Sequence, residues 1–242
     1  MARILISSDR SLCVEFGDEI SEAINGLVNA FAAAVERAEI PGVTELVPTY
    51  RSLTVHYRPE VIQYGELRTV LENLTTQISE GTHVPAEEVR IPVLYGGAFG
   101  PDLPQVAALH GLSEQEVVEL HCKPSYLIYM MGFLPGFCYL GGLDDRLATP
   151  RLKVPRVSIP AGSVGIAGKQ TGIYPIESPG GWQLIGRTPL KLYDPGRKEP
   201  ILLRAGMRLK YYAIDRKEFD RLWAEEHPEE ALPQGGQTDD HI

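Results

Sequence analysis

The chain has 242 residues, of which 43% are hydrophobic and 23% are charged, and its formal net charge is −9. These fractions exclude a globally disordered chain, and no apolar run approaches the roughly 18 residues of a membrane-spanning helix. The acidic balance and the lack of aromatic-basic motifs make nucleic acid a poor expectation as a partner.

About the first 85 residues, and the strand that follows them, are predicted to alternate strands and helices, from apolar spacings of two or of three and four. The elements in chain order are a strand at 13–16 that pairs with or continues 3–7, a helix at 20–38, strands at 43–49 and 53–57, a helix opened by Pro59, and a strand at 89–94. This order predicts a ferredoxin-like βαββαβ domain, which we assign to residues 1–88.

The following stretch is predicted to be helical, first weakly at 103–110 and then from a capping box. In that box Ser113 caps the helix and Glu116 reaches back, and the helix runs to about His121. Beyond it the apolar period falls to two, and glycine or proline separates short predicted strands at 126–131, 163–167, 171–176, 182–185, 190–193, 201–204 and 208–214. This pattern predicts a β-barrel or sandwich over residues 89–226, closed by a helix at 218–226.

Charge is unevenly distributed along the chain. The last 18 residues contain six acidic residues and no lysine or arginine, so residues 227–242 are predicted to be an acidic flexible tail. Residues 146–198 instead contain nine basic and two acidic residues. That excess indicates either a solvated basic face or a site for a small anion such as a carboxylate or phosphate.

The three cysteines, Cys13, Cys122 and Cys138, form no Cys-x-x-Cys pair. We therefore expect no disulfide framework and no structural zinc site, which fits a reducing compartment. Cys138 has no sequence support as a nucleophile. The apolar stretch at the N-terminus is too short for a signal peptide, so the predicted location is the cytoplasm.

A glycine-rich segment at 161–172 raises the question of a phosphate-binding loop. Ser163 stands where a P-loop needs its first glycine and Gln170 where it needs a hydroxyl, and no helix follows, so we reject this assignment. The glycines either permit tight turns, or let the backbone approach a ligand that Lys169, Gln170 and Thr171 contact.

Other residue types in this half have both structural and functional explanations. Trp182 follows a Ser178-Pro-Gly-Gly turn and is more often a core residue than a ligand platform, whereas Arg187 either braces a loop or forks onto a carboxylate. The three aromatic residues at 133–139 usually indicate packing. A lone histidine such as His121 is more often structural, but it is also the best general acid or base in the sequence, because its ordinary pKa lies near neutrality, and we expect it at the barrel rim.

Several motifs closely resemble the KipI family, which includes the B subunit of bacterial ATP-dependent 5-oxoprolinase and was long labelled allophanate hydrolase subunit 1. They are Gly-Pro-Asp-Leu at 100–103, Gly-Phe-Leu-Pro-Gly-Phe-Cys-Tyr-Leu-Gly-Gly-Leu at 132–143, the Pro-Arg pairs at 150–151 and 155–156, the glycine-rich stretch at 160–175, and Ser-Pro-Gly-Gly-Trp-Gln-Leu-Ile-Gly-Arg-Thr at 178–188. The resemblance covers about residues 3–225.

This resemblance implies a cyclophilin-like β-barrel, the KipA-like C subunit and the A subunit of 5-oxoprolinase as partners, and ATP as co-substrate of the complex, with a Mg²⁺ requirement left open. The implied reaction converts 5-oxoproline to L-glutamate. Two alternatives are an inhibitor of a sensor histidine kinase and a carboxyltransferase-type subunit related to urea carboxylase or allophanate hydrolase. Prolyl isomerase activity lacks support, because a fold does not carry a function.

The resemblance places Arg156, Ser163, Gln170, Thr171, Tyr174 and Arg187 along the site, with His121 near it. From the resemblance and the motifs together, the predicted catalytic residues are His121, Arg156 and Arg187, and no metal ligands are expected. The predicted substrate-binding residues are Arg151, Gly162, Ser163, Gly165, Lys169, Gln170, Thr171, Tyr174, Ser178 and Trp182.

Overall fold

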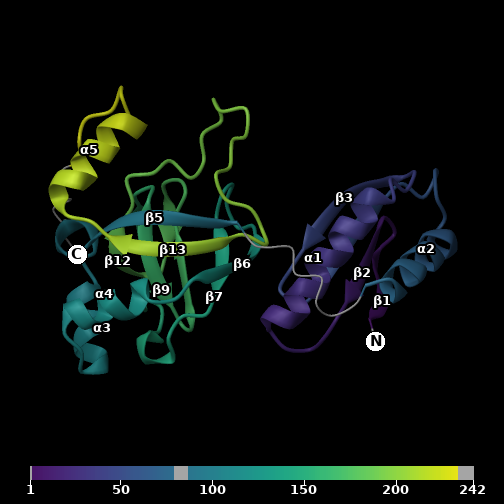
Figure 1. Ribbon diagram of the computed structural model, residues 1–242, viewed down its shortest axis with the longest axis horizontal. Helices are drawn as coiled ribbons and strands as arrows, with labels where there is room; N and C mark the ends of the chain where they lie inside the picture. Colours follow the sequence, from purple (N-terminus) through teal and green to yellow (C-terminus); the bar gives the residue numbers. More distant parts are fainter. Residues whose placement is uncertain (1, 79–86, 234–242) are drawn as a thin grey trace. The chain divides into compact units, whose positions relative to one another are not determined.

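A computed structural model describes residues 2–78 and 87–233 of the chain. The chain folds into two compact units, Met1–Ala86 and Glu87–Ile242 (Figure 1). Each unit has its own hydrophobic core. Within the described residues, no helix combines the length and the apolar character needed to cross a membrane.

The first unit is a four-stranded antiparallel sheet with two helices. The strands follow the spatial order β1-β2-β4-β3. The elements are β1 (Arg3–Ser8), β2 (Ser11–Glu15), α1 (Glu22–Arg37), β3 (Val43–Pro48), β4 (Ser52–Tyr57) and α2 (Tyr64–Thr76).

The strand predicted to complete a ferredoxin-like pattern is not part of this sheet. The segment at 89–94 forms β5 (Glu88–Tyr95), which pairs with strands of the second unit. The edge beside β2 is instead filled by β1, because the two strands are joined by a tight turn at Asp9 and Arg10. The observed order is ββαββα, so the predicted βαββαβ order is wrong.

The helices of the first unit follow the predicted apolar spacing, with one difference at a boundary. Buried Val28, Phe31 and Val35 of α1 pack on the sheet. The second helix begins at Tyr64 and not at Pro59. The chain turns there first, and the side chain of Gln63, which caps α2, donates to the Pro59 carbonyl.

The second unit is built around a seven-stranded sheet that curls into a nearly closed barrel. Its strand order is β10-β9-β12-β5-β13-β6-β7, and the two edge strands, β7 and β10, lie against each other. Besides β5, the unit contains α3 (Leu103–His110), α4 (Glu114–Cys122), β6 (Tyr126–Met131), β7 (Cys138–Gly141), β8 (Arg156–Ile159), β9 (Ser163–Ala167), β10 (Gln170–Ile173), β11 (Ser178–Gly180), β12 (Gln183–Arg187), β13 (Arg208–Ala213) and α5 (Arg216–Glu226).

The prediction of a barrel is therefore confirmed, as are α3, the Ser113–Glu116 capping box of α4 and the closing helix. The strands predicted at 190–193 and 201–204 are wrong, because these segments meet only in an isolated bridge between Tyr193 and Ile201. Prolines at 189, 195 and 200 remove backbone donors that a longer ladder would need.

The barrel interior and its helical cover form one apolar core. Ile91 and Val93 of β5 and Leu209 of β13 are fully buried in it. Helices α3 and α4 pack together against β12 and β13, and α5 follows β13 directly (Figure 1).

Gly100, just before α3, tests this packing. A Cβ atom there would collide with the Ile185 carbonyl of β12, whereas a Cβ at Gly181 would meet only ordinary contacts. We expect Gly100→Ala to lower the free energy of unfolding of the second unit by about 1–3 kcal/mol. Both tryptophans lie in this unit, so their fluorescence during urea unfolding reports on it alone.

Gly181→Ala is the matched control and should change the stability by less than about 0.5 kcal/mol. Equal stability of the two variants would contradict the close approach of the Gly100 backbone to β12.

Candidate functional site

The predicted site residues occupy several separate places in the second unit, and His121 lies in its interior. This side chain is fully buried and packs over the Tyr211 ring at a centroid distance of 4.4 Å. The expectation that it lies at an accessible barrel rim is wrong, because α4 turns its last residues inward onto the core.

A chain of hydrogen bonds fixes the protonation form of His121. The Thr171 hydroxyl donates to the Gly165 carbonyl, so its oxygen accepts from His121 Nε2 at 2.7 Å, and Tyr95 donates its hydroxyl to Nδ1 at 2.7 Å. Burial lowers the pKa of His121 to about 3, so the ring is neutral at physiological pH. In this geometry the hydrogen bonds of His121 and Thr171 link helix α4 to strands β10 and β9 of the barrel.

Cys138 is equally inaccessible. Burial raises the pKa of its thiol to about 12, which fits the expectation that it is no nucleophile.

The glycine-rich segment forms the β9–β10 hairpin and not a phosphate loop. Gly168, with φ of +56°, makes the turn, and Lys169 beside it is exposed and pairs with Asp145 at 2.7 Å. Ser163 is buried and donates to the Pro160 carbonyl. The hairpin leads into no helix, so it offers no cradle for a triphosphate.

A second group of predicted residues surrounds Arg156 on β8. Its guanidinium donates to Asp102 Oδ1 at 2.7 Å and to the Trp182 carbonyl at 3.3 Å. The other Asp102 oxygen accepts from the backbone N–H of Leu184 on β12 at 2.6 Å. Arg156 is therefore a brace between β8, β12 and the start of α3, with its charge matched by Asp102.

The aromatic residues of this group are core residues. Tyr174 and Trp182 both pack edge-on against Phe137, and both are buried. Burial raises the pKa of Tyr174, and the nearby charges of Arg151 and Arg156 partly oppose this. Ser178 is also buried, and its hydroxyl has no hydrogen-bond partner among the described residues.

Arg187 behaves differently from Arg156. It ends β12, donates through Nε to the Ala161 carbonyl at 2.8 Å, and places its guanidinium carbon 4.9 Å from the centre of the Trp223 ring. Burial lowers the pKa of Arg187. Among the described residues no carboxylate lies within ion-pair distance of the Arg187 guanidinium, although the charge of Glu230 acts on it.

A cavity of about 400 Å³ opens next to Arg187. Gly162 lies in its wall with φ of +82°, and a Cβ atom there would collide with the Thr188 carbonyl, so glycine is required. The walls come from the turn before β9, the segment after β10, the loop after β12 and helix α5, and include Pro160, Ala161, Pro175, Glu177, Lys191, Tyr193, Asp194, Trp223, His227 and Glu230.

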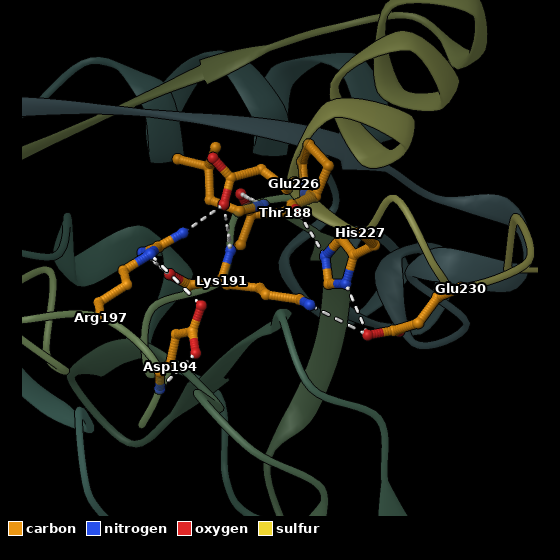
Figure 2. Close-up of polar contacts among 10 residues, drawn as sticks. Thr188, Lys191, Asp194, Arg197, Glu226, His227 and Glu230 are labelled. Atoms are coloured by element: carbon orange, nitrogen blue, oxygen red, sulfur yellow. Dashed lines mark hydrogen bonds and ion pairs between the residues drawn. The ribbon is translucent and has the colours of Figure 1, made fainter.

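The loop after β12 is tied to the end of α5 by polar contacts (Figure 2). Arg197 bonds Glu226 at 2.7 Å, and His227 Nε2 donates to the Pro189 carbonyl at 2.9 Å. His227 is buried and stacks on Trp223 at 3.7 Å, so the predicted flexible tail does not begin at 227. The remainder of that tail, 234–242, lies outside the described residues.

Of the predicted residues, the structure thus brings only Gly162 and Arg187 to this cavity. Sequence reasoning missed Lys191, Trp223, His227 and Glu230 as site residues. Lys191 belongs to the basic excess at 146–198, which had indicated an anion site. Trp223 had been predicted only to pack from the closing helix, and His227 and Glu230 only to belong to the acidic tail. Among the described residues, no group of three or more histidines, cysteines and acids could hold a metal ion.

Comparisons with known proteins agree with this architecture. The family description "Carboxyltransferase domain, subdomain C and D" matches residues 2–203. The chain belongs to this family. It is 47% identical over 221 residues to the B subunit of 5-oxoprolinase from Bacillus subtilis (strain 168), covering 87% of this chain and 92% of that protein.

Two solved structures contain a similar fold inside longer chains. The crystal structure of TTHA0988 matches with a TM-score of 0.76 and 40% identity, over 85% of this chain but only 40% of that one. The Kluyveromyces lactis urea carboxylase matches with a TM-score of 0.72 over 93% of this chain and 23% of its own, and its 20% identity supports the fold alone.

The buried His121 network gives a prediction for stability against pH. Because the pKa of His121 falls from 6.5 to about 3 on folding, the unfolded chain binds a proton between these values that the folded chain does not. The wild type should therefore lose up to about 1.4 kcal/mol of unfolding free energy per pH unit as pH falls through this window.

Glutamine in His121→Gln cannot titrate, so the unfolding free energy of this variant should not contain the loss caused by protonation of His121. The variant should be less stable than the wild type at pH 7.5, but its unfolding free energy should fall less between pH 7.5 and 4.5. Urea unfolding followed by tryptophan fluorescence at pH 7.5 and 4.5 measures the difference. Parallel losses in the two proteins would show that His121 is not held neutral.

Proposed function

We propose that the chain is the B subunit of an ATP-dependent 5-oxoprolinase, which converts 5-oxoproline to L-glutamate together with a KipA-like C subunit and an A subunit. The observation that carries this proposal is the 47% identity to a 5-oxoprolinase B subunit over 92% of that protein's length. The 40% coverage of TTHA0988 supports the need for further protein parts, since this fold there is one portion of a longer chain.

The reaction sets clear chemical demands. 5-Oxoproline is a five-membered cyclic amide that carries one carboxylate, and its amide is stable towards water. Phosphoryl transfer from ATP to the amide oxygen would activate the carbon. Water would then add to that carbon, and the C–N bond would break with a proton going to nitrogen, which leaves an acyl phosphate. A second water would hydrolyse this acyl phosphate to the carboxylate of glutamate and inorganic phosphate. The complex must therefore bind a carboxylate, position ATP and stabilise phosphoryl charge.

The described residues of this chain are suited to bind a carboxylate but not to position ATP. Arg187 offers a guanidinium without an ion-pair partner among the described residues, in a cavity large enough for a small cyclic acid. The glycine-rich hairpin lacks the helix of a nucleotide loop, and the described residues hold no metal cluster. We therefore propose that this chain contributes carboxylate binding and that ATP is held mainly by the partner proteins.

Reconstitution tests this function. The chain combined with candidate A and C subunits should release glutamate from 5-oxoproline only when ATP is present, and the chain alone should show no 5-oxoproline-dependent ATP hydrolysis. Turnover by the isolated chain would contradict the shared site. A complex without oxoprolinase activity that inhibits a histidine kinase or transfers a carboxyl group would favour the alternatives.

Arg187→Ala tests the carboxylate anchor within the reconstituted complex. Losing a charged hydrogen bond costs about 1.5–3 kcal/mol, so KM for 5-oxoproline should rise by roughly 10- to 150-fold. Lys198→Ala, an exposed charge from the same basic stretch, is the control and should leave KM within about twofold. Small and equal effects of both changes would support a merely solvated basic face.

A further inference from the structure

A carboxylate from the chain itself lies at the Arg187 cavity. The Glu230 side chain reaches back from beyond α5 and places Oε1 3.1 Å from Lys191 Nζ and 3.2 Å from His227 Nδ1 (Figure 2). These two contacts lower the pKa of Glu230, and its charge also acts on the guanidinium of Arg187. Three cationic or protonatable side chains thus face one carboxylate.

Two residues that line the cavity also carry buried polar atoms that Glu230 does not satisfy. The indole N–H of Trp223 and Nδ1 of His227 are buried and lack a hydrogen-bond partner among the described residues. His227 Nδ1 meets Glu230 at ion-pair distance but outside hydrogen-bond geometry. Buried polar atoms are normally satisfied, so Glu230 leaves the polar groups beside this cavity incompletely paired. Because His227 already donates Nε2–H to the Pro189 carbonyl, Nδ1 of its neutral ring is an acceptor, and the donor that remains unpaired in the described part of the chain is the Trp223 indole N–H.

Glu230 is suited to leave this position. Its side chain is 53% exposed, and its partner Lys191 is 28% exposed, so solvent screens the contact. Exposed ion pairs contribute little to stability, whereas the half-buried Arg187 has no comparable partner among the described residues. An incoming anion would exchange a weak internal contact for a stronger one with Arg187.

The lining residues select the class of anion. Glu177, Asp194 and Glu230 all line the cavity, and their negative charges disfavour a multiply charged phosphate. A single carboxylate on a small, otherwise neutral molecule matches both the volume and the group that Glu230 presents.

We propose that this cavity is a binding site for a small monocarboxylate and that Glu230 is a built-in competitor, which the ligand displaces. The proposal rests on the proposed function only for the identity of the natural ligand. Competition by Glu230 keeps the apparent affinity of the isolated chain low, because only the fraction of molecules with Glu230 displaced can bind.

Calorimetric titration of the full chain tests the proposal with four probes: 5-oxoproline, L-glutamate, 2-pyrrolidinone, which lacks the carboxylate, and inorganic phosphate. 5-Oxoproline should bind weakly to the wild type and about 3- to 10-fold more tightly to Glu230→Gln. Glu229→Gln makes the same change of charge at a neighbouring exposed residue and should leave the affinity unchanged.

Arg187→Gln should abolish binding, and Lys191→Met, at the cavity wall, should weaken it if Arg187→Gln does not fold. Equal or weaker binding of 5-oxoproline by Glu230→Gln, or no binding by any variant, overturns the proposal. Binding of phosphate or 2-pyrrolidinone in place of 5-oxoproline overturns the ligand class. If Glu230→Gln binds 5-oxoproline more tightly but the reconstituted complex has no 5-oxoprolinase activity, the competition by Glu230 stands and only the proposed function is refuted.

Discussion

The pairing of β5 with both β12 and β13 is the constraint on which the candidate site depends. Arg187 on β12 lies opposite Leu94, and Ala213 at the end of the parallel strand β13 lies opposite Val93. The ends of β12 and β13 therefore meet at the same end of β5. Since α5 begins three residues after β13, this register brings Trp223 onto the Arg187 guanidinium and makes α5 a wall of the cavity.

Arg156 and Arg187 belong to the same basic stretch, but the residues around each guanidinium give the two arginines different roles. Arg156 faces Asp102, whose two oxygens are both used in hydrogen bonds, so the pair joins elements and has little left for a ligand. Arg187 is half-buried beside an aromatic ring and a backbone carbonyl, without a matching carboxylate at ion-pair distance among the described residues. A partly desolvated cation without a carboxylate at ion-pair distance is incompletely stabilised, and an anionic ligand would stabilise it further.

Local patterns predicted much of this fold, and two of the predicted residues, Gly162 and Arg187, line the candidate cavity. Apolar periods located most helices and barrel strands, and Arg187 emerged from a basic stretch with a specific motif. The inclusion of the 89–94 strand in a ferredoxin-like order failed because strand pairing across more than 100 residues leaves no local signal. For the same reason the sequence around His227 and Glu230 was predicted to be an acidic tail. His121 was predicted to lie at the barrel rim, although its burial and its hydrogen bonds with Tyr95 and Thr171 determine its protonation state.

A crystal structure of the chain with 5-oxoproline would test the carboxylate site most directly. We expect the ligand carboxylate within about 3 Å of the Arg187 guanidinium, the usual distance of a charge-assisted hydrogen bond, with Glu230 moved away from Lys191 and His227. Ligand bound elsewhere in the second unit, or bound at Arg187 while Glu230 keeps both of its contacts, would contradict this expectation.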